Sequence, residues 1–193
     1  SGQGKENFTV NEPVIMRPLD KTGTITLFSV KFGRDNFWSG WQDRSYRGEM
    51  EINTAAQRLN IINQVTLEEY LYGVVPSEMP ASWPLEALKA QAVAARSEAM
   101  RKLGRHKKGG FDFCPEVHCQ VYSGVEQETL VTNQAVNETK GMIMVYAGKP
   151  VDAVYSSNCG GHTQDNIFGD AVDIPYLRGR LDILEANEGK FPL

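Results

Sequence analysis

The sequence predicts an α+β fold in which mixed strands and a C-terminal hairpin pack around one long, alanine-rich helix. Three observations predict it. The first third of the chain alternates apolar and polar residues, an alanine-rich stretch with helical spacing follows, and two short apolar runs flank Gly148 in the last third. The 193 residues, 41% hydrophobic and 23% charged, are enough to form one substantial core.

Strands are predicted where apolar and polar residues alternate between Gly, Asp and Asn residues. Four segments have this pattern: residues 8–10, 24–30, 48–52 and 59–63. We expect residues 1–45 to form a strand-rich N-terminal segment and residues 46–193 to form one continuous globular unit.

A short helix is predicted after the last of these strands. Thr66 and Glu69 have the spacing of a capping box, in which each side chain bonds the backbone of the other residue. Gly73 is expected to end this helix, which places Glu78 in the segment that joins it to the next helix.

The long helix is expected to begin between residues 82 and 84, with Ser82 as N-cap and Pro84 in the first turn, and to end at Gly104. Small and apolar residues recur along it at three- and four-residue spacing, which predicts a packed face. This face comprises Leu85, Leu88, Ala92, Ala95, Ala99 and Leu103. A further helix is expected over residues 130–139, and residues 142–146 and 151–155 are expected to pair as the hairpin.

Glu78 is the candidate catalytic residue, because it lies between Val74-Val75-Pro76 and Met79 just before the long helix. Burial disfavours the charged form of a carboxyl group, which suits a general acid that works near neutral pH. The alternative is a solvated glutamate near the positive end of a helix.

Gln91 and Arg96 interrupt the alanine-rich helix, and long polar side chains need partners when they are buried. Both are candidate substrate-binding residues, and Arg96 could bind a substrate carboxylate or orient Glu78. The alternative is that they belong to the solvated face of the helix.

A candidate metal site lies in the segment 114–119, where Cys114, His118 and Cys119 offer two sulfur ligands and one nitrogen ligand. Cys159 or His162 could supply the fourth ligand of a zinc ion. The chain has three cysteines, so a disulfide between Cys114 and Cys119, or between one of them and Cys159, is the competing interpretation.

The segment 155–163 is a candidate sugar-binding surface. Gly160 and Gly161 permit a close approach of the backbone, whose N–H groups could contact a sugar, although a tight turn explains two glycines equally well. Tyr155 and Ser157 precede them in the same segment.

The composition excludes some functional classes. A net charge of −4 and a pI near 5.5 give no electrostatic signature of a nucleic-acid-binding protein. The basic residues between 101 and 108 are explained by the end of a helix, with a surface for an anionic polymer as the alternative. No apolar stretch approaches the roughly 18 residues of a membrane span, so we expect contact with a membrane to be peripheral at most.

Four segments together resemble the SpoIID/LytB family of bacterial cell-envelope proteins. They are residues 67–79 (LEEYLYGVVPSEM), 83–96 (WPLEALKAQAVAAR), 119–124 (CQVYSG) and 155–163 (YSSNCGGHT). The resemblance covers roughly Tyr46 to Asp170. It implies that the protein is exported to the cell envelope, that Tyr155 and Ser157 line a cleft, and that a structural zinc lies near the cysteine pair.

The family includes lytic transglycosylases and enhancers of an amidase, so the resemblance implies two functions. In the first, Glu78 cleaves the bond between N-acetylmuramic acid and N-acetylglucosamine in peptidoglycan glycan strands, as acid and then as base. In the second, the protein binds peptidoglycan without cleaving it and assists a cell-wall amidase. Hydrolysis would need a second carboxylate, for which Asp165, Asp170 and Glu86 are candidates. A zinc hydrolase that uses the cysteine cluster and Glu116 is a third interpretation.

Overall fold

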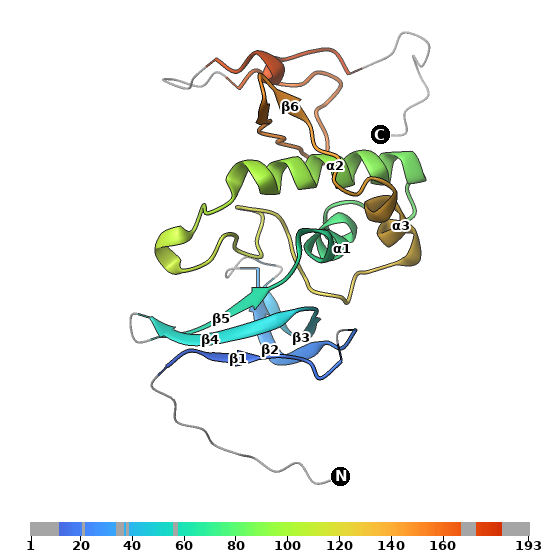
Figure 1. Ribbon diagram of the computed structural model, residues 1–193. Coiled ribbons are helices and arrows are strands. Elements are labelled where there is room, and N and C mark those ends of the chain that lie inside the picture. Colours follow the sequence, from blue (N-terminus) through green and yellow to red (C-terminus); the bar gives the residue numbers. More distant parts are fainter. Residues whose placement is uncertain are drawn as a thin grey trace. The chain divides into compact units, whose positions relative to one another are not determined.

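The computed structural model describes residues 12–20, 22–33, 37, 39–55, 58–166 and 173–182. The chain forms two compact units, residues 1–153 and residues 154–193. Helices and antiparallel strands both occur in the first unit, which confirms the α+β class (Figure 1).

Five strands begin the first unit: β1 (Val14–Met16), β2 (Ile25–Phe32), β3 (Gly40–Tyr46), β4 (Glu49–Ala55) and β5 (Arg58–Gln64). They form an antiparallel sheet of order β1-β4-β5 and a separate pair of β2 with β3. The predicted strands at 24–30, 48–52 and 59–63 are confirmed as β2, β4 and β5. The one predicted at 8–10 lies outside the described residues, and the sequence pattern did not predict β1 and β3.

Helix α1 (Leu67–Glu78) begins with the predicted capping box, since Thr66 and Glu69 bond each other's backbone. The helix does not end near Gly73, and the prediction that Glu78 lies in a joining segment is wrong: Glu78 is the last residue of α1. The helix also continues past Pro76, because the N–H of Met79 still donates to the carbonyl of Val75 at 3.0 Å.

Gly73 is needed for close packing and does not end the helix. A Cβ atom at this position would lie 2.6 Å from Cε2 of Tyr122 and 2.7 Å from the carbonyl oxygen of Gly124. The loop that carries Tyr122 therefore packs directly against the backbone of α1.

We expect Gly73→Ala to destabilise the protein by about 1–3 kcal/mol, because the added methyl group overlaps a buried ring and a backbone carbonyl. Helix propensity alone predicts the opposite sign, a gain of about 1 kcal/mol. Urea unfolding followed by circular dichroism decides between them, and a stabilised variant would contradict the packing argument.

Helix α2 (Leu85–Lys102) is the predicted long helix, but its N-cap is Pro84, so the assignment of Ser82 as N-cap is wrong. Most of the predicted face is confirmed: Leu88, Ala92, Ala95 and Ala99 are at most 2% exposed. The prediction fails for Leu103, which is exposed because it is the C-cap, beyond the last turn that follows the helical spacing. Gly104, with a φ of +78°, turns the chain away.

Helix α3 (Leu130–Glu138) also begins with a capping box, formed by Thr129 and Thr132. The hairpin after it is shorter than predicted, since β6 (Val145–Tyr146) pairs only with β7 (Lys149–Pro150). Ala147 and Gly148 both have positive φ, as a two-residue hairpin turn requires. Residues 151–155 form no strand.

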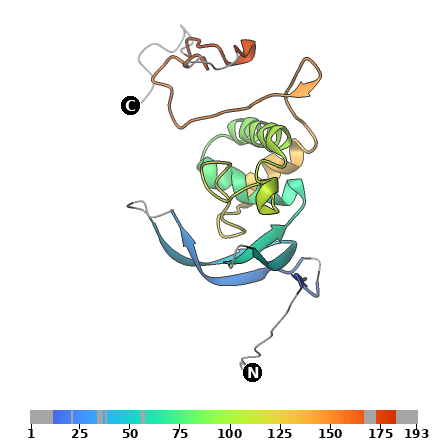
Figure 2. The ribbon, with the colours of Figure 1, turned by 90° about the vertical axis from the view of Figure 1, so that its left-hand side faces the viewer.

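The three helices form one layer of the first unit, in which α1 and α3 both pack against α2. The two views agree that the five N-terminal strands lie on the side of α1 away from α2 (Figures 1 and 2). One core joins these layers, with Tyr46 and Met50 from the strands, Leu71 and Val74 from α1, and Leu88 from α2. The N-terminal strands thus meet α1, and α1 separates them from the long helix.

Candidate functional site

Glu78 is held at the end of α1 by a segment far away in the sequence. Its Oε1 accepts a hydrogen bond of 2.6 Å from the backbone N–H of Val121, and its side chain is half-buried. The preceding residues Val74 and Val75 are completely buried, so the end of the helix is firmly anchored in the core. The structure therefore brings together two segments that the sequence analysis singled out separately, 67–79 and 119–124.

The residues on either side of Val121 are themselves fixed. The Gln120 side chain is 3% exposed and donates through Nε2 to the carbonyl of Ala95 at 3.0 Å. The Tyr122 hydroxyl donates to Oδ1 of Asn63 at 2.8 Å. Burial raises the pKa of Tyr122 above its ordinary value, so this hydroxyl keeps its proton and stays a donor. The sequence analysis did not identify these two side chains as site residues.

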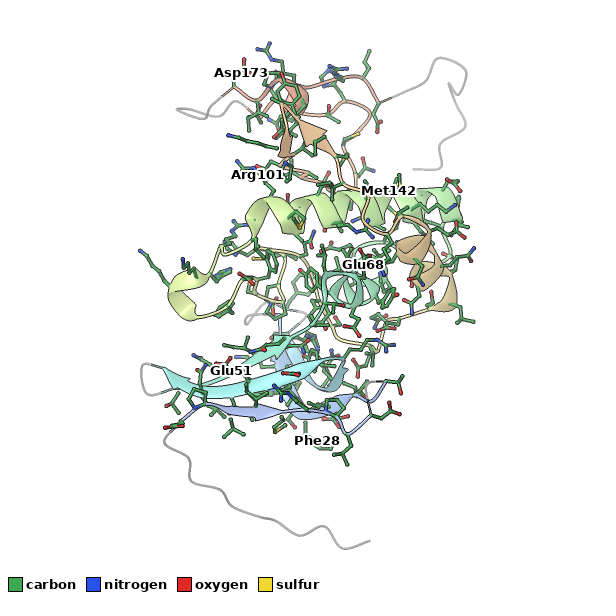
Figure 3. The ribbon with its side chains drawn as sticks, viewed as in Figure 1. Phe28, Glu51, Glu68, Arg101, Met142 and Asp173 are labelled. Carbon is green, nitrogen blue, oxygen red and sulfur yellow. The ribbon has the colours of Figure 1, made fainter. Side chains whose placement is uncertain are left out.

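Arg96 is buried, at 1% exposure, and its partners belong to the protein. Its guanidinium forms a bidentate pair with Glu68 of α1, with Nε–Oε1 and Nη2–Oε2 distances of 3.1 and 2.7 Å. It also donates to the carbonyls of Met142 and Val136 at 3.0 and 3.3 Å. Arg96 therefore connects all three helices; its partners Glu68 and Met142 are labelled in Figure 3.

We expect Arg96→Ala to cost about 3–5 kcal/mol of folding free energy, because it removes the cationic partner of the partly buried Glu68 carboxylate and a donor to two carbonyls. Chemical denaturation measures the loss. Lys89→Ala is the control, since Lys89 pairs with Glu86 and Glu138 at the surface and its removal should have a clearly smaller effect. Equal effects would contradict the structural role of Arg96.

Gln91 is buried as well, at 8% exposure. Within the described part of the chain its Nε2 finds no hydrogen-bond partner. A buried amide of this kind is uncommon in proteins, and it keeps Gln91 among the candidate substrate-binding residues.

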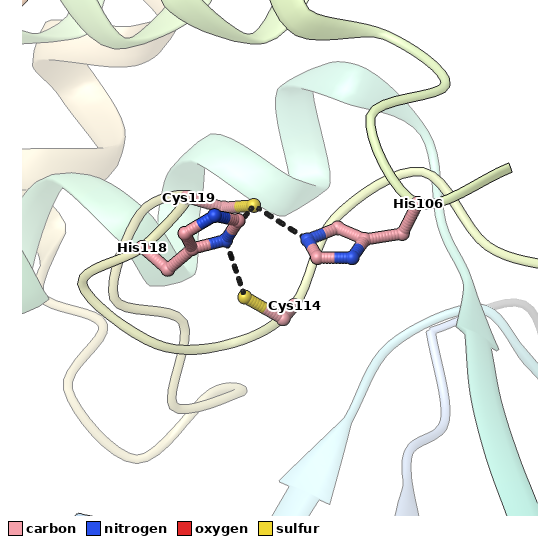
Figure 4. Close-up of side chains that lie close together, drawn as sticks. All are labelled: His106, Cys114, His118 and Cys119. Carbon is pink, nitrogen blue, oxygen red and sulfur yellow. Dashed lines mark hydrogen bonds between the residues drawn. The ribbon is translucent and has the colours of Figure 1, made fainter. Parts of the chain in front are cut away.

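Four side chains of residue types that can bind a metal ion lie close together beside the loop that carries Val121 (Figure 4). They are His106, Cys114, His118 and Cys119, and their ligand atoms all lie within 4.8 Å of one another. Nε2 of His106 is 3.2 Å from Sγ of Cys119, and Nδ1 of His118 is 3.7 Å from each of the two sulfurs.

The donor set of this cluster fits zinc. Two thiolates and two imidazoles are a common set of structural zinc ligands, and in a tetrahedral site such ligand atoms lie roughly 3.3–3.8 Å apart. Both Cys114 and Cys119 are free thiols, and burial raises the pKa of Cys119 above its usual range. A bound cation would stabilise the thiolate form of Cys119 and so oppose the effect of burial on its pKa.

His106 completes the cluster, a role that the sequence analysis gave to Cys159 or His162. It follows α2 within the basic run, and its ring stacks on Phe111 at 5.0 Å between centroids. Cys159 belongs to the second unit, where its thiol lies 3.2 Å from Oδ2 of Asp182. His162 belongs to the same unit and forms an isolated β-bridge with Leu181.

The second unit carries the candidate sugar-binding residues. Gly160 and Gly161 have φ of +68° and +90°, and the N–H of Gly160 donates to Oδ1 of Asn158, so both glycines form a tight turn. Tyr155 and Ser157 are exposed just before it. A cavity of about 750 Å³ in this unit is lined by Tyr155, Asn158, Cys159, His162, Asp165, Tyr176 and Arg178, among others.

Two of the three candidates for a second carboxylate contact other residues of the protein. The Glu86 side chain is 82% exposed and pairs with Lys89, while Oδ1 of Asp165 accepts a hydrogen bond from the N–H of Gly179. Asp170 lies outside the described residues. Another cavity, of about 830 Å³, lies between β2, β5 and residues 110–115, and Glu78 is not one of its lining residues.

Comparison with known proteins shows which family part of the first unit resembles. The family model described as SpoIID, Stage II sporulation protein, matches residues 55–146, a segment that contains Glu78, the loop of Val121 and the four-residue cluster. This match supports the SpoIID/LytB-like assignment that the sequence motifs indicated.

Individual relatives agree. An uncharacterized protein of Brachyspira hyodysenteriae is 42% identical over 137 residues, which cover 69% of this chain and 37% of that protein. The amidase enhancer of Bacillus subtilis is 41% identical over 119 residues, covering 62% and 16%. Stage II sporulation protein D of the same organism is 35% identical over 133 residues, covering 61% and 38%. The chain thus spans well under half the length of these relatives.

The described residues include no helix that is long and apolar enough to cross a membrane.

Proposed function

We propose that this protein is a lytic transglycosylase that cleaves the glycan strands of peptidoglycan between N-acetylmuramic acid and N-acetylglucosamine. The observation that carries the proposal is the Glu78 carboxyl group at the end of α1, held by the N–H of Val121 inside the segment that matches the SpoIID family model. The relatives named for sporulation and for amidase enhancement support a role at the cell wall, outside the cytoplasm.

In the proposed reaction, Glu78 first donates its proton to the glycosidic oxygen as the bond to C1 of N-acetylmuramic acid breaks. The carboxylate formed then removes the proton of the C6 hydroxyl of the same sugar. The C6 oxygen attacks C1, giving a 1,6-anhydro end and returning the proton to Glu78. One carboxyl group therefore completes the cycle without water.

The contacts made by the candidate second carboxylates are consistent with this single-carboxyl route. Hydrolysis with inversion or retention generally needs two carboxyl groups on opposite sides of the bond. Glu86 is exposed and paired with Lys89, and Oδ1 of Asp165 accepts a hydrogen bond from the N–H of Gly179. A single-carboxyl mechanism needs neither.

Zinc, if bound by His106, Cys114, His118 and Cys119, would supply structural stabilisation and no reaction step. Four protein ligands close a tetrahedral site, so no position remains for a catalytic water. This argues against a zinc hydrolase that would use Glu116. With zinc bound, these four residues would instead hold the turn after α2 to the loop 114–119, which leads to Val121 and hence to Glu78.

The second unit would supply glycan contacts. Tyr155 offers an aromatic face, Ser157 a hydroxyl group, and Gly160 and Gly161 an accessible backbone. Gln91 offers a further amide in the first unit. Nucleic acid is not among the proposed partners, because the protein is acidic overall.

The identity of the products tests the proposal. Peptide-free glycan strands are incubated with the protein, and the new ends are identified by mass spectrometry. We expect 1,6-anhydro-N-acetylmuramic acid ends. Reducing ends would show hydrolysis, and intact strands with a folded, glycan-bound protein would overturn the enzymatic proposal.

A second candidate function is the enhancement of a cell-wall amidase, favoured by the 41% identity to the Bacillus subtilis amidase enhancer. In this case the protein would bind peptidoglycan and a partner enzyme without cleaving the glycan. The discriminating result is simple: amidase stimulation would survive Glu78→Gln, whereas a stimulation that depends on glycan cleavage would not.

A further inference from the structure

The backbone N–H that holds Glu78 lies between two side chains that are anchored in different directions. On one side, buried Gln120 donates to the carbonyl of Ala95 in α2 at 3.0 Å. On the other, Tyr122 donates to Asn63 in β5 at 2.8 Å. Between them, the N–H of Val121 donates to Glu78 in α1.

This segment has no regular secondary structure of its own, so its conformation depends on these contacts. Residues 120–122 belong to no helix or strand. The N–H of Tyr122 donates to the carbonyl of Pro115 at 3.2 Å, and Nη1 of Arg44 donates to the carbonyl of Tyr122 at 3.5 Å. The side-chain anchors therefore determine where the N–H of Val121 points.

The Tyr122 side chain is more constrained than the hydrogen bond of its hydroxyl indicates. Its ring lies against the backbone of Gly73 and packs near Tyr46 and Tyr70, at centroid distances of 5.9 and 5.1 Å. The ring fixes the position of the segment against α1. The hydroxyl fixes its rotation, because it reaches a single acceptor on β5.

Asn63 is a rigid acceptor for that hydroxyl. Its Nδ2 donates to the carbonyls of Arg47 and Glu49, which leaves Oδ1 turned toward Tyr122. The chain of contacts from β5 through Tyr122 and Val121 to Glu78 is therefore continuous.

We infer that Tyr122 and Gln120 are positioning residues, which set the orientation of the Glu78 carboxyl group through the backbone N–H of Val121. The inference rests on the proposed function of Glu78 and assigns the two flanking side chains a role in that chemistry. Neither residue touches the substrate in this account. Their loss lowers the rate of the chemical step and leaves substrate binding unchanged.

Tyr122→Phe is the test, because it removes the hydroxyl and keeps the packed ring. We expect kcat to fall about 10- to 100-fold, since small displacements of a catalytic group have effects of this size, while KM stays constant.

Tyr72→Phe is the matched control. Tyr72 belongs to α1, and its hydroxyl also donates to an asparagine side chain, Oδ1 of Asn137, at 2.6 Å. Both variants lose one tyrosine hydroxyl bound to an asparagine, and we expect only Tyr122→Phe to lower kcat while KM stays constant. A second pair serves if Tyr122→Phe does not fold: Gln120→Met removes the bond to Ala95, and Gln134→Met removes the exposed bond to Glu138.

Hydrogen exchange gives a readout that needs no catalysis. NMR measures exchange of the Val121 amide proton, which should be protected in the wild type and in Tyr72→Phe and should exchange faster in Tyr122→Phe. A wild type that cleaves no glycan but shows this pattern would overturn the proposed function and leave the positioning network standing. Unchanged exchange in both Tyr122→Phe and Gln120→Met, or equal rate losses in the test and control variants, would overturn the inference.

Discussion

Glu78→Gln should reduce the rate of glycan cleavage by about 10²–10⁴-fold, the usual contribution of a general acid or base. The amide has nearly the shape of the carboxyl group, and its oxygen can still accept the hydrogen bond from the N–H of Val121. It cannot donate a proton to the leaving oxygen or remove one from the C6 hydroxyl. Fold and glycan binding should therefore persist while activity is lost, as circular dichroism, a binding assay and product analysis can show.

Glu86→Gln is the control for this variant. Glu86 stands in the first turn of α2, is 82% exposed, and was one of the candidates for a second carboxylate. We expect wild-type activity from it. A comparable loss in Glu86→Gln would indicate a two-carboxylate mechanism, and full activity in Glu78→Gln would remove Glu78 from the chemistry.

Removal of zinc should have the second large effect, on stability. If His106, Cys114, His118 and Cys119 hold the ion, its binding free energy contributes to folding, about 4 kcal/mol when free zinc exceeds its dissociation constant a thousandfold. Cys119→Ser should lose the metal and lower the melting temperature to that of the chelator-treated wild type. Metal analysis and thermal unfolding with and without a chelator provide the measurement.

The chain offers two matched controls for the metal site. Cys159→Ser changes the remaining cysteine, and His162→Ala changes a histidine of the second unit. Both should keep one zinc per chain, whereas Cys119→Ser and His106→Ala should lose it. Zinc retained in His106→Ala but lost in Cys159→Ser would restore the ligand set expected from the sequence and exclude the one described in the structure.

Local signals were the most predictable part of the fold. The capping box of Thr66 and Glu69 depends on residues three apart, and it marks the start of α1 correctly. The end of the helix was predicted wrongly. A glycine is needed at position 73 because the ring of Tyr122 packs against the helix backbone there, and no local sequence pattern reveals this tertiary contact. Because α1 continues past Gly73, Glu78 is part of the helix and not of a joining segment.

The candidate site was predictable to the extent that its chemistry is encoded by residue type. Cys114, His118 and Cys119 were recognised as a ligand cluster because they are close in sequence. His106 was not, because it stands in a basic run and reaches the cluster only through the turn after α2. The pairing of Arg96 with Glu68, 28 residues away, likewise depends on how the helices pack.

The isotopic composition of the cleaved ends tests the central claim most directly. Peptide-free glycan strands are digested by the wild type in water enriched in the heavy isotope of oxygen, and the new N-acetylmuramic acid ends are weighed by mass spectrometry. Because the C6 oxygen of the sugar itself attacks C1, we predict anhydro ends that contain no oxygen from the solvent. Ends that carry the heavy isotope would show that water is the nucleophile and would contradict the single-carboxyl mechanism of Glu78.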